Sequence, residues 1–138
     1  MRPTPFRNAL LVTALAITVG ACNQNRDAEY TEALLGTWVM QDMMEGGAVL
    51  DAETTFLSGG RVNWSGRISY QGQSVPIIAS GTWRVENGHL HYTVETSNIT
   101  ELLPNGFASA DSIVSVSAKE YVYVSGSEGE TVVEQRKT

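Results

Sequence analysis

The sequence predicts an all-β fold: a small antiparallel up-and-down barrel of about eight strands, preceded by a signal peptide and a flexible tether. From Leu34 onward, apolar residues alternate with polar ones at a period of two, which is the spacing of strands with one buried face. Glycine turn signals separate these short runs. No clear helical periodicity follows residue 21, although "YTEALL" is compatible with one turn or a short helix. Closure would pair every strand edge, and a two-sheet sandwich is the alternative architecture.

The N-terminal segment has the properties of an export signal. Arg2 and Arg7 precede the apolar run "ALLVTALAITVGA", which covers residues 9–21. As a helix this run would span about 20 Å, which is short of the roughly 30 Å of a bilayer core. A positive start, a short apolar stretch and small residues at its end indicate a signal peptide over residues 1–21 rather than a membrane anchor.

The only cysteine of the chain, Cys22, follows this segment directly in "VGAC". A single cysteine cannot form a disulfide within its chain, and the polar stretch "NQNRDAEYTE" that follows argues against a buried position. "VGAC" resembles the bacterial lipobox. The resemblance implies cleavage between Ala21 and Cys22, a diacylglycerol group on the Cys22 sulfur and a fatty acyl chain such as palmitate on the new amine. Asn23 in the next position implies sorting to the periplasmic face of the outer membrane rather than to the inner membrane.

Composition and charge describe the part of the chain that would remain after cleavage. Residues 22–33 are expected to be a polar tether that carries the lipidated cysteine, and residues 34–138 to be one barrel domain. The chain has 9 basic and 15 acidic side chains, and the signal peptide contains two of the arginines. Such an acidic domain lacks the basic surface that nucleic acids and anionic headgroups require. We therefore expect no nucleic-acid partner and contact with the membrane only through the lipid anchor at Cys22.

Eight runs satisfy the strand pattern. They cover residues 36–43, 52–58, 61–71, 74–86, 89–97, 111–118, 120–126 and 130–136. Two of these runs can be aligned residue by residue, because Asn87-Gly88 between them is the dipeptide best suited to a type I′ turn. A hairpin closed there pairs Trp83 with Tyr92, Val85 with Leu90, Arg84 with His91 and Glu86 with His89. The apolar side chains then share one face of the hairpin and the polar ones share the other.

Patterns that could support chemistry have simpler structural explanations. His89 and His91 share a strand face like a pair of metal ligands, but Arg84 lies opposite His91 and no third ligand has a suitable spacing. The methionines of "MQDMM" would suit Cu(I), but methionine commonly fills gaps in protein cores. The chain has no Gly-x-Ser-x-Gly nucleophile motif and no phosphate-binding glycine loop. We therefore expect no catalytic residue, no metal and no cofactor.

The tripeptide Gly-Thr-Trp occurs twice, at residues 36–38 and 81–83. A Gly-x-Trp in the first strand resembles the opening motif of the lipocalins and the wider calycin group of antiparallel barrels. The resemblance covers residues 34–136. It implies that Trp38 packs at the closed end of a barrel, beneath a basic side chain of the last strand, here Arg136. With Trp83, which the hairpin register places on the buried face, these two residues form the expected structural set.

The connection over residues 97–111 is long and carries two leucines and a phenylalanine among turn residues. Connections of this length are uncommon and often serve as lids or binding loops, but the same apolar side chains would also serve as a plug for one barrel end. The candidate ligand-binding residues are Trp38, Met40, Leu102, Leu103 and Phe107.

The sequence thus favours a non-catalytic envelope lipoprotein whose barrel binds a small apolar ligand or another envelope component. The alternative is an inhibitor of a secreted hydrolase of the protease or lysozyme type. Barrels with a Gly-x-Trp strand occur among bacterial protease inhibitors, although the internal disulfide of that family has no counterpart here. An open apolar cavity would favour ligand binding, whereas a filled interior with a projecting loop would favour inhibition.

Lipidation can be tested at Cys22. The substitution Cys22→Ser should release the protein from membranes, because the acyl chains attached at this sulfur are the expected anchor. Globomycin, which blocks cleavage of lipoprotein signals, should make an uncleaved and more slowly migrating form accumulate. Membrane fractionation and gel mobility check both results. A Cys22→Ser protein that stays in the membrane with unchanged mobility would contradict the lipobox interpretation.

Overall fold

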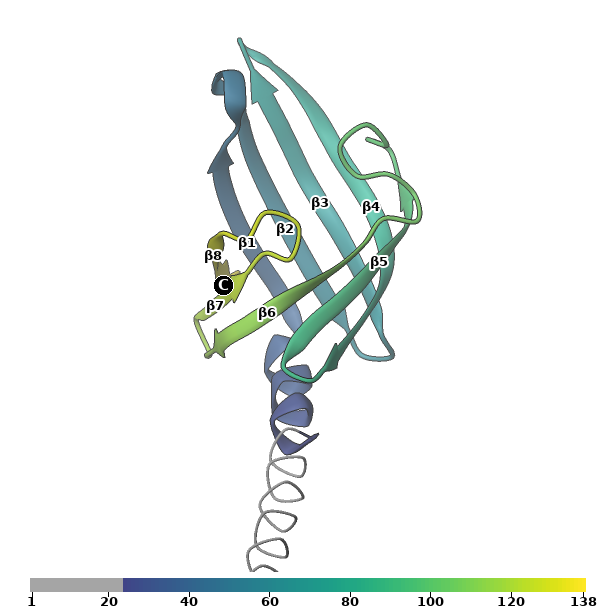
Figure 1. The fold of residues 1–138 in the computed structure, drawn as a ribbon. Coiled ribbons are helices and arrows are strands. Elements are labelled where there is room, and N and C mark those ends of the chain that lie inside the picture. The colour runs from purple at the N-terminus through teal and green to yellow at the C-terminus, as the bar shows by residue number, and fades with distance from the viewer. Residues whose placement is uncertain (1–23) are drawn as a thin grey trace, which may run out of the picture.

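The computed structural model describes residues 24–138, so that Cys22 and the predicted signal peptide lie outside the described residues. Eight antiparallel strands close into one barrel in which each strand pairs with its neighbours in sequence and β1 pairs with β8 (Figure 1). The strands are β1 (Gly36–Met43), β2 (Val49–Leu57), β3 (Arg61–Tyr70), β4 (Gln73–Glu86), β5 (His89–Ser97), β6 (Ala108–Val116), β7 (Glu120–Val124) and β8 (Thr131–Arg136). A short 3-10 helix, η1 (Glu45–Gly47), connects β1 to β2. The predicted up-and-down barrel is confirmed, and the sandwich alternative is wrong.

The strand bounds agree with the sequence to within two residues except at two starts. β2 begins at Val49 rather than at residue 52, and β6 begins at Ala108 rather than at residue 111. In both places the extra residues pair with a neighbouring strand, since Val49 lies opposite Ser69 and Ala108 lies opposite Thr93. Pairing with a partner far along the chain therefore extends these strands beyond the stretch in which alternation is visible.

The predicted hairpin between β4 and β5 is present in the predicted register. Trp83 lies opposite Tyr92 and Arg84 lies opposite His91. Asn87 and Gly88 have φ angles of 53° and 74°, the positive values that a type I′ turn requires. The register therefore follows from turn chemistry and alternation together.

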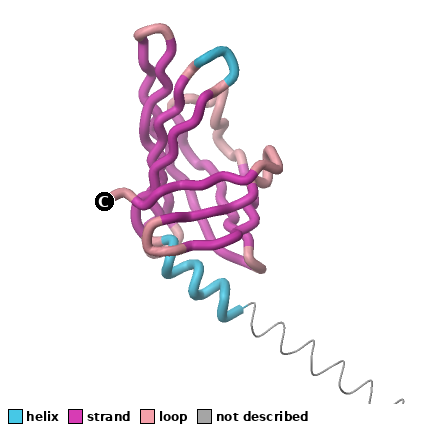
Figure 2. The backbone as a smooth tube through the Cα atoms, turned by 90° about the vertical axis from the view of Figure 1, so that its left-hand side faces the viewer, coloured by secondary structure: helices cyan, strands magenta, loops and turns pink. Residues whose placement is uncertain are grey.

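Residues 24–34 form a helix next to one end of the barrel, purple in Figure 1 and cyan in Figure 2. The structure differs here from the expected flexible tether, because this helix is docked. The Asp27 carboxylate accepts hydrogen bonds from the backbone N–H groups of Asn87 and Gly88, at 2.7 and 2.8 Å, and Leu34 is fully buried. These contacts lie far along the chain, in the β4–β5 turn and on the strands that pack against Leu34, so the local polarity of the segment does not reveal the docking. Within residues 24–138, no helix has the length and apolar character needed to cross a membrane.

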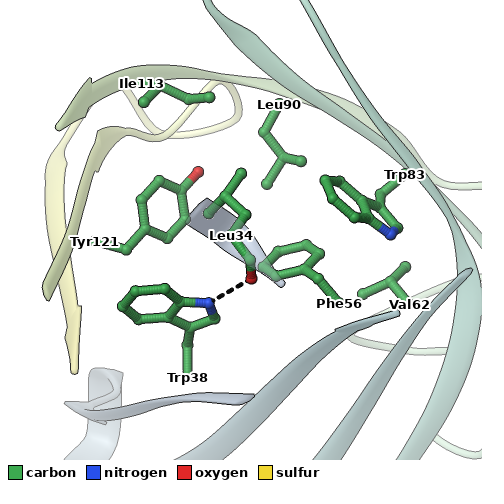
Figure 3. Packing of buried hydrophobic residues seen from close by; sticks show 8 residues of the cluster. All are labelled: Leu34, Trp38, Phe56, Val62, Trp83, Leu90, Ile113 and Tyr121. Carbon is green, nitrogen blue, oxygen red and sulfur yellow. Dashed lines mark hydrogen bonds between the residues drawn. The ribbon is translucent and has the colours of Figure 1, made fainter. Parts of the chain in front are cut away.

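A cluster of buried side chains fills the end of the barrel beside this helix (Figure 3). Its members are Leu34, Trp38, Phe56, Val62, Trp83, Leu90, Ile113 and Tyr121. Trp38 is completely buried, and its indole Nε1 donates a hydrogen bond of 2.8 Å to the Leu34 carbonyl. The indole Nε1 of Trp83 donates a hydrogen bond of 3.0 Å to the Leu57 carbonyl. Both tryptophans therefore contribute apolar burial without leaving a polar atom unpaired.

The seam between β1 and β8 is the weakest strand pairing of the barrel. Only two residue pairs join the strands, Trp38 with Arg136 and Val39 with Gln135. The Arg136 guanidinium lies over the Trp38 indole, 4.2 Å from the ring centroid, as the resemblance to lipocalins implies. A Cβ atom at Gly36, which has a φ of +116°, would lie 2.9 Å from Nη1 of this guanidinium. The first Gly-Thr-Trp therefore needs its glycine both for backbone conformation and for space.

Backbone carbonyl groups hold the same guanidinium in place. Arg136 Nη2 donates to the Ala33 carbonyl at 2.6 Å and Nη1 donates to the Leu35 carbonyl at 2.8 Å, at the end of the helix. Its Nε donates to the Ala118 carbonyl at 2.8 Å, in the connection before β7. One side chain thus joins the N-terminal helix, the first strand and the last two strands.

We expect the Trp38–Arg136 contact to stabilise the closed barrel. A double-mutant cycle of Trp38→Phe and Arg136→Ala should give a favourable coupling of about 0.5–2 kcal/mol in the free energy of unfolding. Arg136→Lys should recover only part of the loss, because a compact ammonium group cannot stack on the indole or reach three separate carbonyl groups as the planar guanidinium does.

Urea unfolding of the four proteins measures this coupling. Arg84 offers a matched control, since its side chain is 65% exposed on the outside of the barrel. Arg84→Ala combined with Trp38→Phe should be additive within about 0.5 kcal/mol. Strict additivity of the Trp38 and Arg136 substitutions would show that the contact does not support the seam.

Candidate ligand-binding cavity

A cavity of about 360 Å³ lies inside the barrel above the filled end. It shares Leu90 and Tyr121 with the core cluster and extends to Met40, Leu102 and Leu103 on the side away from the helix. This volume lies near the lower limit of ordinary small-molecule sites, which is about 300 Å³. The interior of the barrel is therefore filled at one end and hollow above it.

Strand register makes the wall of the cavity apolar. Met40 of β1 lies opposite Ala52 of β2, and Leu50 of β2 lies opposite Ile68 of β3. Side chains directly opposite one another in an antiparallel pair point to the same face, and all four of these residues line the cavity. Alternation along three neighbouring strands thus produces a continuous apolar surface.

The loop over residues 98–107 covers one side of this cavity. It connects β5 to β6, and Asn98 fixes its start by donating a side-chain hydrogen bond of 2.8 Å to the Pro76 carbonyl on β4. Leu102 and Leu103 line the cavity, although Leu102 remains 55% exposed. The loop therefore contributes a wall at the end far from the helix rather than filling the barrel.

Two buried carboxyl groups interrupt the apolar lining. Asp111 on β6 is 5% exposed and Glu134 on β8 is 6% exposed, and both line the cavity. Asp111 Oδ1 accepts a hydrogen bond of 3.0 Å from the backbone N–H of Gly126. Glu134 lies opposite Tyr121 in the β7–β8 pairing and accepts a hydrogen bond from the Tyr123 hydroxyl. The ion pairs of residues 24–138 include neither carboxyl group.

Burial changes the acidity of these groups. Desolvation raises the pKa of Glu134 from its ordinary 4.5 to about 7, the Tyr123 hydroxyl partly offsets this, and the nearby Asp111 charge adds to it. Burial also raises the pKa of Asp111, and the hydrogen bond from the Gly126 N–H opposes this rise. Burial and the Asp111 charge raise the pKa of Tyr92, another lining residue, to about 12. The cavity therefore contains a carboxyl group that exchanges its proton near neutral pH.

A tyrosine hydroxyl at the base of the cavity has no hydrogen-bond partner among residues 24–138. Tyr121 is 1% exposed, and its ring packs edge-on against Trp38 at 5.9 Å and stacks on Tyr123 at 4.6 Å between centroids. Its hydroxyl points toward the middle of the barrel in Figure 3. In the part of the chain that the structure describes, it is the only buried side-chain polar atom without a hydrogen-bond partner. Such an atom is costly unless something else satisfies it.

The structure brings together part of the predicted ligand-binding set. Met40, Leu102 and Leu103 line the cavity, whereas Trp38 lies below it in the core cluster. Phe107 is not a lining residue and packs 6.3 Å from the Tyr92 ring instead. The titratable lining residues were not predicted as a site from the sequence; they are Tyr92, Asp111, Tyr121, Tyr123, Glu128 and Glu134.

No three His, Cys, Asp or Glu side chains gather into a metal-binding group among residues 24–138. The rings of His89 and His91 lie 6.3 Å apart, and these residues pair with Glu86 and Arg84 across the hairpin, as its register predicts.

Comparison with known proteins gives no family for this chain. No protein-family model matches it, and no curated protein is similar enough to count as a relative. The geometry of the cavity is therefore the basis for a proposed function.

Glu134 should make stability depend on pH. Its pKa is about 7 in the folded protein and near 4.5 in the unfolded chain, so the unfolded chain releases this proton first as the pH rises. The free energy of unfolding should therefore fall between pH 4.5 and 7, by at most about 3 kcal/mol from this group. Glu134→Gln should remove most of this fall, whereas the exposed control Glu130→Gln should keep it. Urea titrations at several pH values measure the free energy of unfolding. The same pH dependence in the wild-type protein and both variants would show that the Glu134 carboxyl group is solvated, contrary to the structure.

Proposed function

We propose that this protein is a non-catalytic lipoprotein of the bacterial cell envelope whose barrel binds a small, largely apolar ligand. The cavity of about 360 Å³ carries this proposal, because its walls are mostly aliphatic and aromatic. A hollow of this size lined in this way is the usual form of a small-molecule site. The proposal agrees with the resemblance to lipocalins, in which a closed end supports a ligand space above it.

The docked helix supports a defined orientation at the membrane. Residue 24 is already helical and lies two positions after Cys22, a distance of at most about 7 Å. Acyl chains on Cys22 would therefore hold the closed end of the barrel close to the bilayer. The cavity would then face away from the membrane, toward the periplasm if the protein reaches the outer membrane.

Inhibition of a hydrolase is less well supported than ligand binding. An inhibitor needs a rigid segment that projects into the partner, whereas Leu102 and Leu103 of the long loop line the cavity. The cavity wall would have no role in that function. An inhibitor therefore remains an outcome of the test rather than a second proposal.

Native mass spectrometry of the detergent-extracted full-length protein tests the proposal. We expect a bound small molecule on the wild-type protein and its loss from Ala52→Phe, because the added ring occupies the cavity. Ala108→Phe is the matched control: Ala108 is exposed, lies outside the cavity lining and should keep the ligand. Wild-type protein that carries a hydrolase in place of a small molecule, or equal retention by both variants, would contradict the proposal.

A further inference from the structure

The polar base of the cavity gives its ligand a chemical class. Asp111, Tyr121 and Glu134 come from three adjacent strands and all line the cavity. Each is more than nine-tenths buried. A purely apolar ligand would leave the Tyr121 hydroxyl without a partner and both carboxyl groups enclosed against hydrocarbon, which is unfavourable.

No cation of the described chain balances these carboxyl groups. The described residues that line the cavity include no lysine, arginine or histidine. Arg136 lies two residues from Glu134 on the same strand face, but its nitrogens donate to backbone carbonyls of Ala33, Leu35 and Ala118. The Arg136 guanidinium therefore binds the seam, and Glu134 is in none of the ion pairs of the described residues.

Structural roles account for only part of this arrangement. Asp111 Oδ1 accepts a hydrogen bond from the Gly126 N–H and so holds the turn between β7 and β8. This structural role explains one of the two carboxylate oxygens of Asp111. Glu134 has a single hydrogen-bond partner in Tyr123, and Tyr121 has none. If position 134 served only stability, an apolar residue would suit it better than Glu134. Replacing buried charged groups by well-packed apolar residues often leaves the free energy of unfolding unchanged or raises it.

We infer that the cavity binds an amphiphilic amine, with its apolar body against the wall formed by Met40, Leu50 and Ile68 and its ammonium group between Asp111 and Glu134. The ammonium donates to the carboxylates and can donate its remaining hydrogen to the Tyr121 hydroxyl oxygen, since an ammonium has three donors. The rings of Tyr92 and Tyr123 line the same region and add an electron-rich surface that attracts a cation. An anionic ligand of the same shape would meet like charge at this point. This inference rests on the proposed function, which requires only that the cavity binds an apolar molecule.

Three ligands with the same octyl chain test it: n-octylamine, n-octanol and n-octanoate. Isothermal titration calorimetry at pH 8 measures each against the full-length protein, with a protein-free detergent blank to correct for partition. We expect the amine to bind more than about tenfold more tightly than the alcohol, and the carboxylate to bind most weakly, because hydrogen bonds to charged groups are the stronger ones. Equal affinity for amine and alcohol, or tighter binding of the carboxylate, would overturn the inference while leaving the proposed function intact. Failure of all three to bind would contradict both.

Two substitutions locate the effect. Glu134→Gln keeps the shape and removes the charge, so the amine should lose about tenfold or more in affinity while the alcohol changes little. Tyr121→Phe should weaken the amine less, because it removes a neutral hydrogen bond. Glu130→Gln, at an exposed position outside the cavity lining, should leave all affinities unchanged. A folded Glu134→Gln protein that keeps its preference for the amine would overturn the inference.

Discussion

The contact of Arg136 with Trp38 is the constraint on which the rest of the structure depends. It closes a seam that backbone pairing alone secures through two residue pairs. Because the guanidinium also binds carbonyl groups of Ala33 and Leu35, closure of the barrel and docking of the N-terminal helix are coupled. One side chain, 98 positions from Trp38 (136 − 38), thus fixes both the topology and the closed end.

The position of the cavity follows from that closed end. Trp38, Leu34 and Phe56 occupy the interior beside the helix, so ligand space is left only beyond them. The Tyr121 ring covers Trp38 edge-on and carries an unpaired hydroxyl into the hollow part. The base of the cavity is therefore the upper surface of the core cluster, and any rearrangement of the core would change the site as well as the stability.

Much of the fold could be predicted from the sequence because its signals are local. Alternation of period two defines each strand, and Asn87-Gly88 fixes the register of one hairpin. The helix over residues 24–34 could not be predicted in the same way, since Asp27 finds its partners in the distant β4–β5 turn and Leu34 packs against residues of distant strands. Its docking depends on tertiary contacts and hardly at all on its own composition.

The polar base of the cavity was accessible to sequence reasoning but was missed. If Arg136 covers Trp38 inside the barrel, then Glu134, two residues earlier on the same strand, must also face inward. The alternation of "EYVYV" likewise directs Tyr121 and Tyr123 to one face. An acidic residue on an interior face is an exception to hydrophobic patterning, and such exceptions concentrate at functional sites. Leu102 and Leu103 could be selected from the sequence because a long apolar loop is visible without knowledge of register, and the structure places both in the cavity lining.

The central claim is that β8 closes the barrel with Arg136 over Trp38 and thereby directs Glu134 into the cavity. A nuclear Overhauser spectrum of the full-length protein tests both parts at once. We expect cross-peaks from the Arg136 side chain to the Trp38 indole, together with cross-peaks from the Glu134 methylene protons to the Tyr121 and Tyr123 rings. Random-coil shifts for Arg136 and Glu134, with no cross-peak to any of these aromatic rings, would contradict it.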